Sequence, residues 1–83
     1  MTSNELDEQV RRIIAVHLDV DAGCLSPSTR LGEDLCVDSL TAVELLMVLE
    51  DEFDIALPED DVGDLRTYGD LVTVVADRVA ARA

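Results

Sequence analysis

Apolar residues recur at helical spacing in three stretches of the chain. At about 100° per residue each stretch places its apolar side chains on one face, the pattern of an amphipathic helix packed on a core. The three inward-facing sets are Leu6, Val10, Ile13, Ile14 and His17; Ala42, Leu45, Leu46, Leu49 and Phe53; and Tyr68, Leu71, Val72, Val75 and Val79. No stretch has the alternation of a convincing β-hairpin, so the pattern predicts an all-α protein.

The segments between these stretches complete the predicted architecture. Residues 21–38 contain Gly23, Pro27 and Gly32 and form a long loop between the first and second helices. Pro58 suits the first turn of a further short helix, with three acidic residues directly after it. We therefore expect a small four-helix bundle, three longer helices plus one short helix, built as a single domain over residues 1–83.

A serine stands where the long loop meets the second helix. Asp38 is placed to accept hydrogen bonds from the free N–H groups of the first helical turn, which predicts it as the N-cap. Ser39 then takes the first helical position, with its hydroxyl exposed.

The outward face of the second helix mixes apolar and acidic side chains. The apolar members are Leu40, Val43 and Met47, and the acidic members are Glu44, Glu50, Asp51 and Asp54. Apolar residues ringed by carboxylates favour a docking surface for a partner protein. The alternative is that a neighbouring loop or helix buries some of these side chains.

The charge of the chain restricts its partners. There are 19 acidic and 6 basic residues, a net charge of −13, and between Arg30 and Arg66 twelve carboxylates occur without one cation. Phosphate backbones and anionic membrane surfaces would be repelled, so we expect neither nucleic acid nor membrane as a partner. The charge favours proteins with basic surfaces, although a solvated acidic face would also keep the protein soluble.

We expect a cytoplasmic monomer that holds no metal. The polar start of the chain has no signal-peptide pattern, and no apolar run reaches the length of a membrane-spanning helix. Cys24 and Cys36 are too far apart for a CxxC motif, so we expect neither a zinc site nor a structural disulfide.

The second helix carries a family resemblance. Asp38-Ser39-Leu40, followed by Val43-Glu44-Leu45, Met47, Leu49-Glu50 and Glu52-Phe53-Asp54, strongly resembles the acyl carrier proteins, and the resemblance extends from Leu6 to about Val79. It implies that Ser39, flanked by Asp38 and Leu40, carries a covalent 4′-phosphopantetheine whose thiol holds an acyl chain as a thioester. A phosphopantetheinyl transferase that uses magnesium would attach the group from coenzyme A.

The resemblance also implies what the protein does with its cargo. The acidic second helix would dock to the transferase, a ketosynthase, an acyltransferase and other basic-surfaced enzymes of fatty-acid or polyketide biosynthesis. The chain itself would be a carrier without catalytic activity.

The sequence departs from the family pattern at one position, and three alternative functions are also considered. Acyl carriers usually have glycine or another small residue where Cys36 stands, and we expect this cysteine to be a small apolar filler. Peptidyl or aryl carriers of non-ribosomal peptide assembly usually have Gly-Gly where this chain has Cys36 and Val37.

The remaining alternatives are an acidic interaction module and an enzyme. An interaction module would have no use for a capped, exposed Ser39. A catalytic triad of Ser39, His17 and a carboxylate lacks the G-x-S-x-G elbow, and His17 is explained more simply as a side chain packed at the edge of the core.

Overall fold

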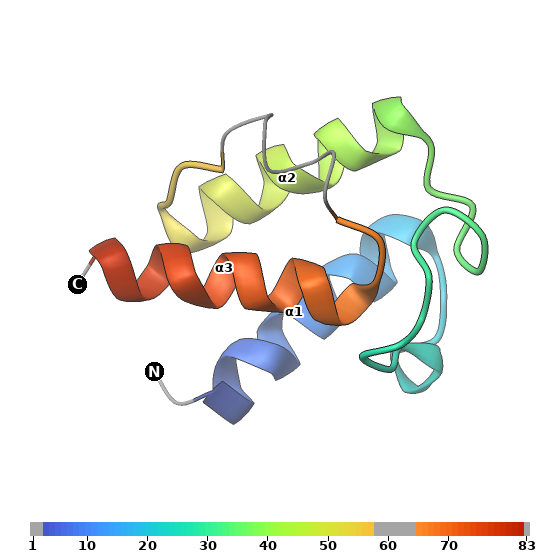
Figure 1. The fold of residues 1–83 in the computed structure, drawn as a ribbon, viewed down its shortest axis with the longest axis horizontal. Coiled ribbons are helices and arrows are strands. Elements are labelled where there is room, and N and C mark those ends of the chain that lie inside the picture. Colours follow the sequence, from blue (N-terminus) through green and yellow to red (C-terminus); the bar gives the residue numbers. More distant parts are fainter. Residues whose placement is uncertain (1–2, 58–64, 83) are drawn as a thin grey trace.

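Each of the three periodic stretches forms an α-helix (Figure 1). The computed structural model describes residues 3–57 and 65–82, with the side chains of residues 3 and 82 excepted. Within these ranges lie α1 (Ser3–Leu18), the 3-10 turn η1 (Ala22–Cys24), α2 (Ser39–Phe53) and α3 (Tyr68–Arg82). The predicted all-α class is confirmed. The short helix predicted from Pro58 lies mostly outside the described residues.

The ends of α2 and α3 are set by local side-chain chemistry. The Asp38 carboxylate accepts a hydrogen bond from the Thr41 N–H at 2.8 Å, as the N-cap prediction required. At its other end α2 stops at Asp54, which takes the left-handed conformation with φ 54°. Before α3, the Thr67 hydroxyl accepts from the Asp70 N–H and the Asp70 carboxylate accepts from the Thr67 N–H, a reciprocal capping box.

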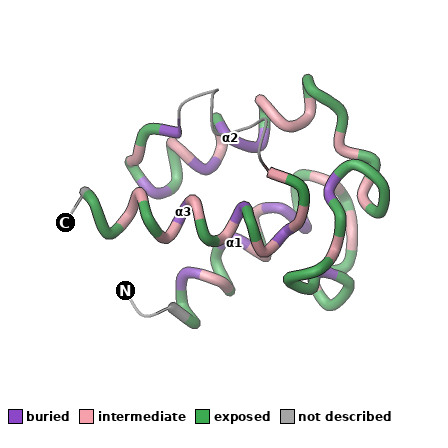
Figure 2. Tube along the Cα trace, in the orientation of Figure 1, coloured by how far each residue is buried: buried purple, intermediate pink, exposed green. Residues whose placement is uncertain are grey.

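The core lies where the three helices face one another (Figure 2). Val10, Ile14, Leu49 and Val75 have no exposed surface at all. These aliphatic side chains can interdigitate between the helices and leave few voids, which gives the close packing typical of protein interiors. Among the described segments, no helix combines the length and apolar character needed to cross a bilayer.

Tyr68 at the start of α3 contacts Asp7 and Arg11 of α1. Tyr68 is 1% exposed, and its hydroxyl donates to the Asp7 backbone oxygen at 3.2 Å and lies 3.0 Å from an Asp7 carboxylate oxygen. The Arg11 guanidinium lies over the ring, 5.2 Å from its centroid. Burial, reinforced by the bond to Asp7, raises the pKa of the Tyr68 hydroxyl, so the phenol is neutral at physiological pH.

The long loop crosses the end of the bundle where α1 ends and α2 and α3 begin (Figure 1). It is joined to the start of α3 by backbone hydrogen bonds from the Tyr68 N–H to the Thr29 oxygen at 2.8 Å and from the Gly69 N–H to the Pro27 oxygen at 3.0 Å. A Cβ at Gly69 would lie 2.7 Å from the Pro27 carbonyl oxygen, so only glycine allows this approach. The loop that leads to Ser39 is therefore held in place by α3.

Candidate functional site

Ser39 is the first residue of α2 and is exposed, as predicted. Asp38 precedes it in an extended conformation, and its carbonyl oxygen accepts the first helical hydrogen bond, from the Ala42 N–H at 2.9 Å. The N–H of Thr41 lowers the pKa of the Asp38 carboxyl group, so this group is ionised at neutral pH. Asp38 thus fixes the backbone that presents the Ser39 hydroxyl to solvent.

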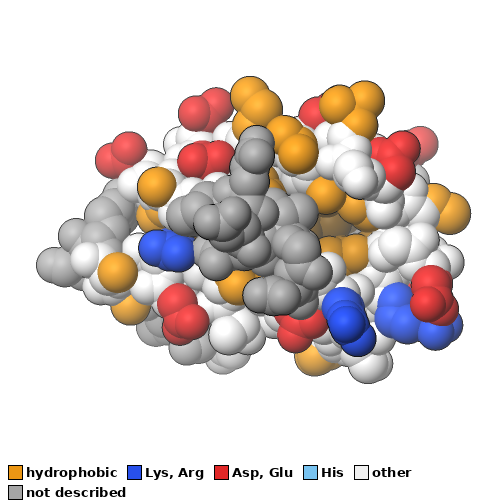
Figure 3. Space-filling view, turned by 45° about the horizontal axis from the view of Figure 1, so that its top comes forward, with side chains coloured by type: hydrophobic (Ala, Val, Ile, Leu, Met, Phe, Trp, Pro, Cys, Tyr) orange, Lys and Arg blue, Asp and Glu red, His pale blue; other side chains and the backbone are white. Residues whose placement is uncertain are grey.

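An apolar cavity of about 280 Å³ lies beside Ser39. Its wall combines the end of the long loop, α2, and side chains next to and within α3: Leu31, Gly32, Val37, Asp38, Ser39, Ala42, Leu45, Leu46, Leu65 and Leu71. A hollow with a hydrophobic floor is visible to the right of centre in Figure 3. The sequence analysis did not predict this cavity, because Leu65 and Leu71 are far from Ser39 in the chain and come next to it only in the fold.

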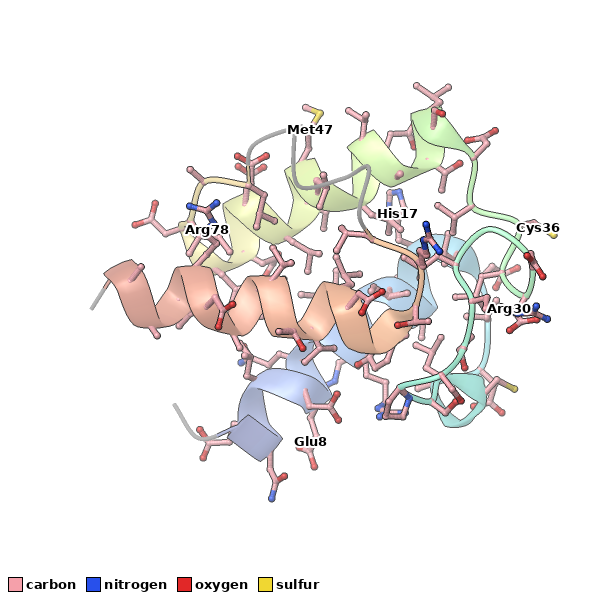
Figure 4. The ribbon with its side chains drawn as sticks, viewed as in Figure 1. Glu8, His17, Arg30, Cys36, Met47 and Arg78 are labelled. Atoms are coloured by element: carbon pink, nitrogen blue, oxygen red, sulfur yellow. The ribbon has the colours of Figure 1, made fainter. Side chains whose placement is uncertain are left out.

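The predicted docking residues divide into two groups by exposure. Leu40 is 68% and Met47 60% exposed, and hydrophobic side chains stand among carboxylates along the upper edge of Figure 3. Glu44, Asp51 and Asp54 are also exposed. In Figure 4, the Met47 side chain points away from the bundle.

The other two predicted docking residues are partly engaged within the fold. Val43 is half-buried. Glu50 is also half-buried, and its carboxylate accepts a hydrogen bond from the Leu57 N–H at 3.3 Å. Glu50 therefore helps to hold the chain that follows α2, and its part in docking stays a prediction.

His17 contacts α2 rather than the core. Its Nε2 atom lies 3.6 Å from a carboxylate oxygen of Glu44, and 30% of its side chain is exposed. His17 thus belongs to the surface between α1 and α2, at the edge of the bundle and outside the inner face of α1. Among the described residues, Ser39 and His17 make no hydrogen bond to each other.

The expectation for Cys36 is wrong. The residue is exposed instead of filling a gap in the core, and its side chain points outward from the loop in Figure 4. Its φ is 58°, in the left-handed region that glycine adopts without steric penalty. The backbone conformation thus gives a physical reason for the glycine that acyl carriers usually have at this place.

Comparisons with known proteins agree with this geometry. The family described as "Phosphopantetheine attachment site" matches residues 8–75. The acyl carrier protein of Picosynechococcus is 39% identical over 79 residues, covering 95% of this chain and 98% of that protein. The acyl carrier protein of Phenylobacterium zucineum is 40% identical over 74 residues, covering 89% and 94%.

Solved structures show the same likeness in three dimensions. A putative acyl carrier protein from Mycobacterium tuberculosis superposes with a TM-score of 0.81 at 38% identity, covering 87% of this chain and 96% of that one. The acyl carrier protein from Enterococcus faecalis gives a TM-score of 0.78 at 29% identity, covering 94% and 99%. The family match, the near-complete coverage of these relatives and the shared fold show that the chain belongs to the acyl carrier proteins, the family with a phosphopantetheine attachment site.

Proposed function

We propose that Ser39 is the attachment point of 4′-phosphopantetheine and that the loaded protein presents acyl thioesters to synthase enzymes. The observation that carries the proposal is the exposed Ser39 hydroxyl at the start of α2, held by the Asp38 cap within the matched residues 8–75. Bound there, the group supplies a thiol on a flexible arm. The chain itself needs no catalytic group for this role.

The surroundings of Ser39 fit such a group. A phosphodiester on the serine oxygen would lie at the N-terminal end of a 15-residue helix, where the helix dipole favours negative charge. The Asp38 carboxylate is already engaged by the Thr41 N–H. The apolar cavity of about 280 Å³ beside Ser39 would shield an aliphatic chain from water.

Loading would be a phosphoryl transfer at the serine oxygen. The Ser39 Oγ forms a bond to the phosphorus of coenzyme A that bears the pantetheine, and the anhydride bond to the adenylate side breaks. Adenosine 3′,5′-bisphosphate leaves, and the hydroxyl proton passes to a base on the transferase. Magnesium belongs to that transferase in this scheme.

The partners in our proposal are the transferase, a ketosynthase, an acyltransferase and related enzymes with basic surfaces. They would bind a surface that we call the α2 face, made of Leu40, Glu44, Met47 and Asp51, with Asp54 at its end and the half-buried Val43 and Glu50 beside it. Exposed carboxylates would speed association with a basic partner, and the two exposed apolar side chains would slow dissociation. The protein would act as a cytoplasmic monomer.

The acidic α2 face favours a carrier of fatty-acyl or polyketide chains over a peptidyl or aryl carrier. Its relatives in the comparisons are also acyl carriers. A non-carrier acidic module would have no use for the combination of exposed serine, capped helix and adjacent cavity.

The test is the intact mass of the protein after incubation with coenzyme A and a permissive phosphopantetheinyl transferase. The wild type should gain one phosphopantetheine, and Ser39→Ala should gain none. Ser28→Ala is the matched control, because Ser28 is an exposed serine in the loop, away from the start of a helix. An unmodified wild type with several transferases, or a modified Ser39→Ala variant, would refute the proposal.

A further inference from the structure

A second surface feature lies between α1 and α2, outside the α2 face. A groove of about 300 Å³ is lined by Arg12, Ile13, Val16 and His17 of α1 and by Val48 and Glu52 of α2. Val16 is 78% exposed, more than any other large hydrophobic residue that the structure describes. Single exposed apolar residues are ordinary, but Val16 lines this groove together with the half-buried Ile13 on the same helix and the half-buried Val48 on α2.

The groove is joined to the α2 face through Glu44. This residue belongs to the α2 face, and its carboxylate lies 3.6 Å from the Nε2 atom of His17 in the groove wall. Glu44 and Asp51 lie within about 20° of one another around α2, and Val48 and Glu52 follow on the side toward α1. A partner that covers Glu44 therefore also meets His17, which lines the same groove as Val16.

The charge around the groove favours a basic protein over a second copy of this chain as its occupant. A second copy of this chain would bring another net charge of −13 against the first, which opposes association. On the α2 side the groove presents Glu52, which among the described residues makes no ion pair. Asp51 is its neighbour in the chain, and Glu44 contacts His17 in the groove wall. These carboxylates complement a basic protein surface.

We propose that the groove is an extension of the docking surface, in which a basic synthase enzyme seats an apolar side chain against Val16 and Val48. A cation of that enzyme would face Glu52, and an acidic group would meet the exposed Arg12. The inference rests on the proposed carrier function, because it assigns the groove to the enzymes that receive the thioester. Arg12 makes the surface selective, since a partner with only cations at this place would be repelled there.

The test compares holo proteins in their binding to the ketosynthase of the same synthase. Val16→Ser removes the exposed apolar group without opening a cavity, and serine and valine have similar helix propensity. Binding should weaken about tenfold, mainly through faster dissociation, as expected for one apolar side chain no longer buried. Glu52→Gln should slow association and reduce its dependence on salt.

The controls separate this inference from the carrier function. Ala80→Ser introduces the same residue at an exposed position of α3, and Glu8→Gln removes an acid on the other side of the molecule from Met47 (Figure 4). Both should bind as the wild type does. All variants should still gain phosphopantetheine. A wild type that is not loaded would refute the proposed function, whereas loss of ketosynthase affinity in the loaded groove variants alone supports the groove.

Two results would overturn the inference. One is unchanged ketosynthase affinity in both Val16→Ser and Glu52→Gln while loading is normal. The other is a wild-type dimer in sedimentation equilibrium that Val16→Ser converts to a monomer, since the groove would then be an interface between copies. If Val16→Ser loses helical circular dichroism, the Glu52→Gln association rate decides the question.

Discussion

Replacing Cys36 by glycine should make the protein more stable. Cys36 has φ 58°, and the left-handed conformation costs an L-residue about 1–2 kcal/mol. Glycine has no such penalty, but fixing its freer backbone costs about 0.5–1 kcal/mol on folding. The exposed side chain contributes little packing, so the difference leaves a gain of about 0.5–1 kcal/mol in the free energy of unfolding.

Thermal and urea unfolding followed by circular dichroism would measure this gain. In a domain of 60–100 residues, 1 kcal/mol shifts the Tm by about 4–8 °C, so Cys36→Gly should raise the Tm by about 3–6 °C. The other cysteine supplies a matched control. Cys24 lies in η1, where φ is not positive, and Cys24→Gly should lower stability by about 0.5–1 kcal/mol.

A second control separates the backbone from the thiol. Cys36→Ser removes the sulfur and keeps the left-handed L-residue, so its stability should match the wild type. A full gain in Cys36→Ser would assign the effect to the thiol. A loss of stability in Cys36→Gly equal to that in Cys24→Gly would refute the strain argument.

Two further predictions concern α3. Gly69→Ala should lower the free energy of unfolding by about 1–3 kcal/mol in urea titrations, because the new Cβ would meet the Pro27 carbonyl oxygen at 2.7 Å; Gly32→Ala, where the nearest atom is 3.8 Å away, should be almost neutral. Burial raises the pKa of Tyr68 in the folded state, so its contribution to stability is complete below the unfolded-state pKa of about 10. This contribution falls as the pH rises above that value toward the higher folded-state pKa. The sole tyrosine should therefore ionise together with the loss of helical circular dichroism. Tyrosinate absorbance that appears near pH 10 with the helices intact would contradict this.

Local chemistry made the helices and their caps predictable from the sequence. Asp38 and Thr67 each sit within three residues of the N–H groups that they satisfy, so the neighbouring sequence is sufficient to identify them. The exposed Leu40 and Met47 followed from helical periodicity in the same way. Such features depend on spacing within one helix.

What the sequence did not predict depends on contacts between distant segments. Leu71 shares a cavity with Ser39, and His17 meets Glu44, only because the helices pack as they do. Cys36 was misjudged for a different reason. A free cysteine is usually buried, which is why Cys36 was expected to fill a gap. Its left-handed φ is set by the path of the loop, and the identity of the residue does not reveal it.

The close passage of the loop over α3 also bears on how this chain could change length during evolution. Pro27, Thr29 and Leu31 are held in register by hydrogen bonds to Gly69, Tyr68 and Arg66. An inserted or deleted residue between Pro27 and Leu31 would break that register and shift the segment leading to Ser39. The exposed stretch around Gly23 and Cys24 lies before the first of these bonds, so an added residue there would leave the register with α3, and with it the position of the serine, unchanged.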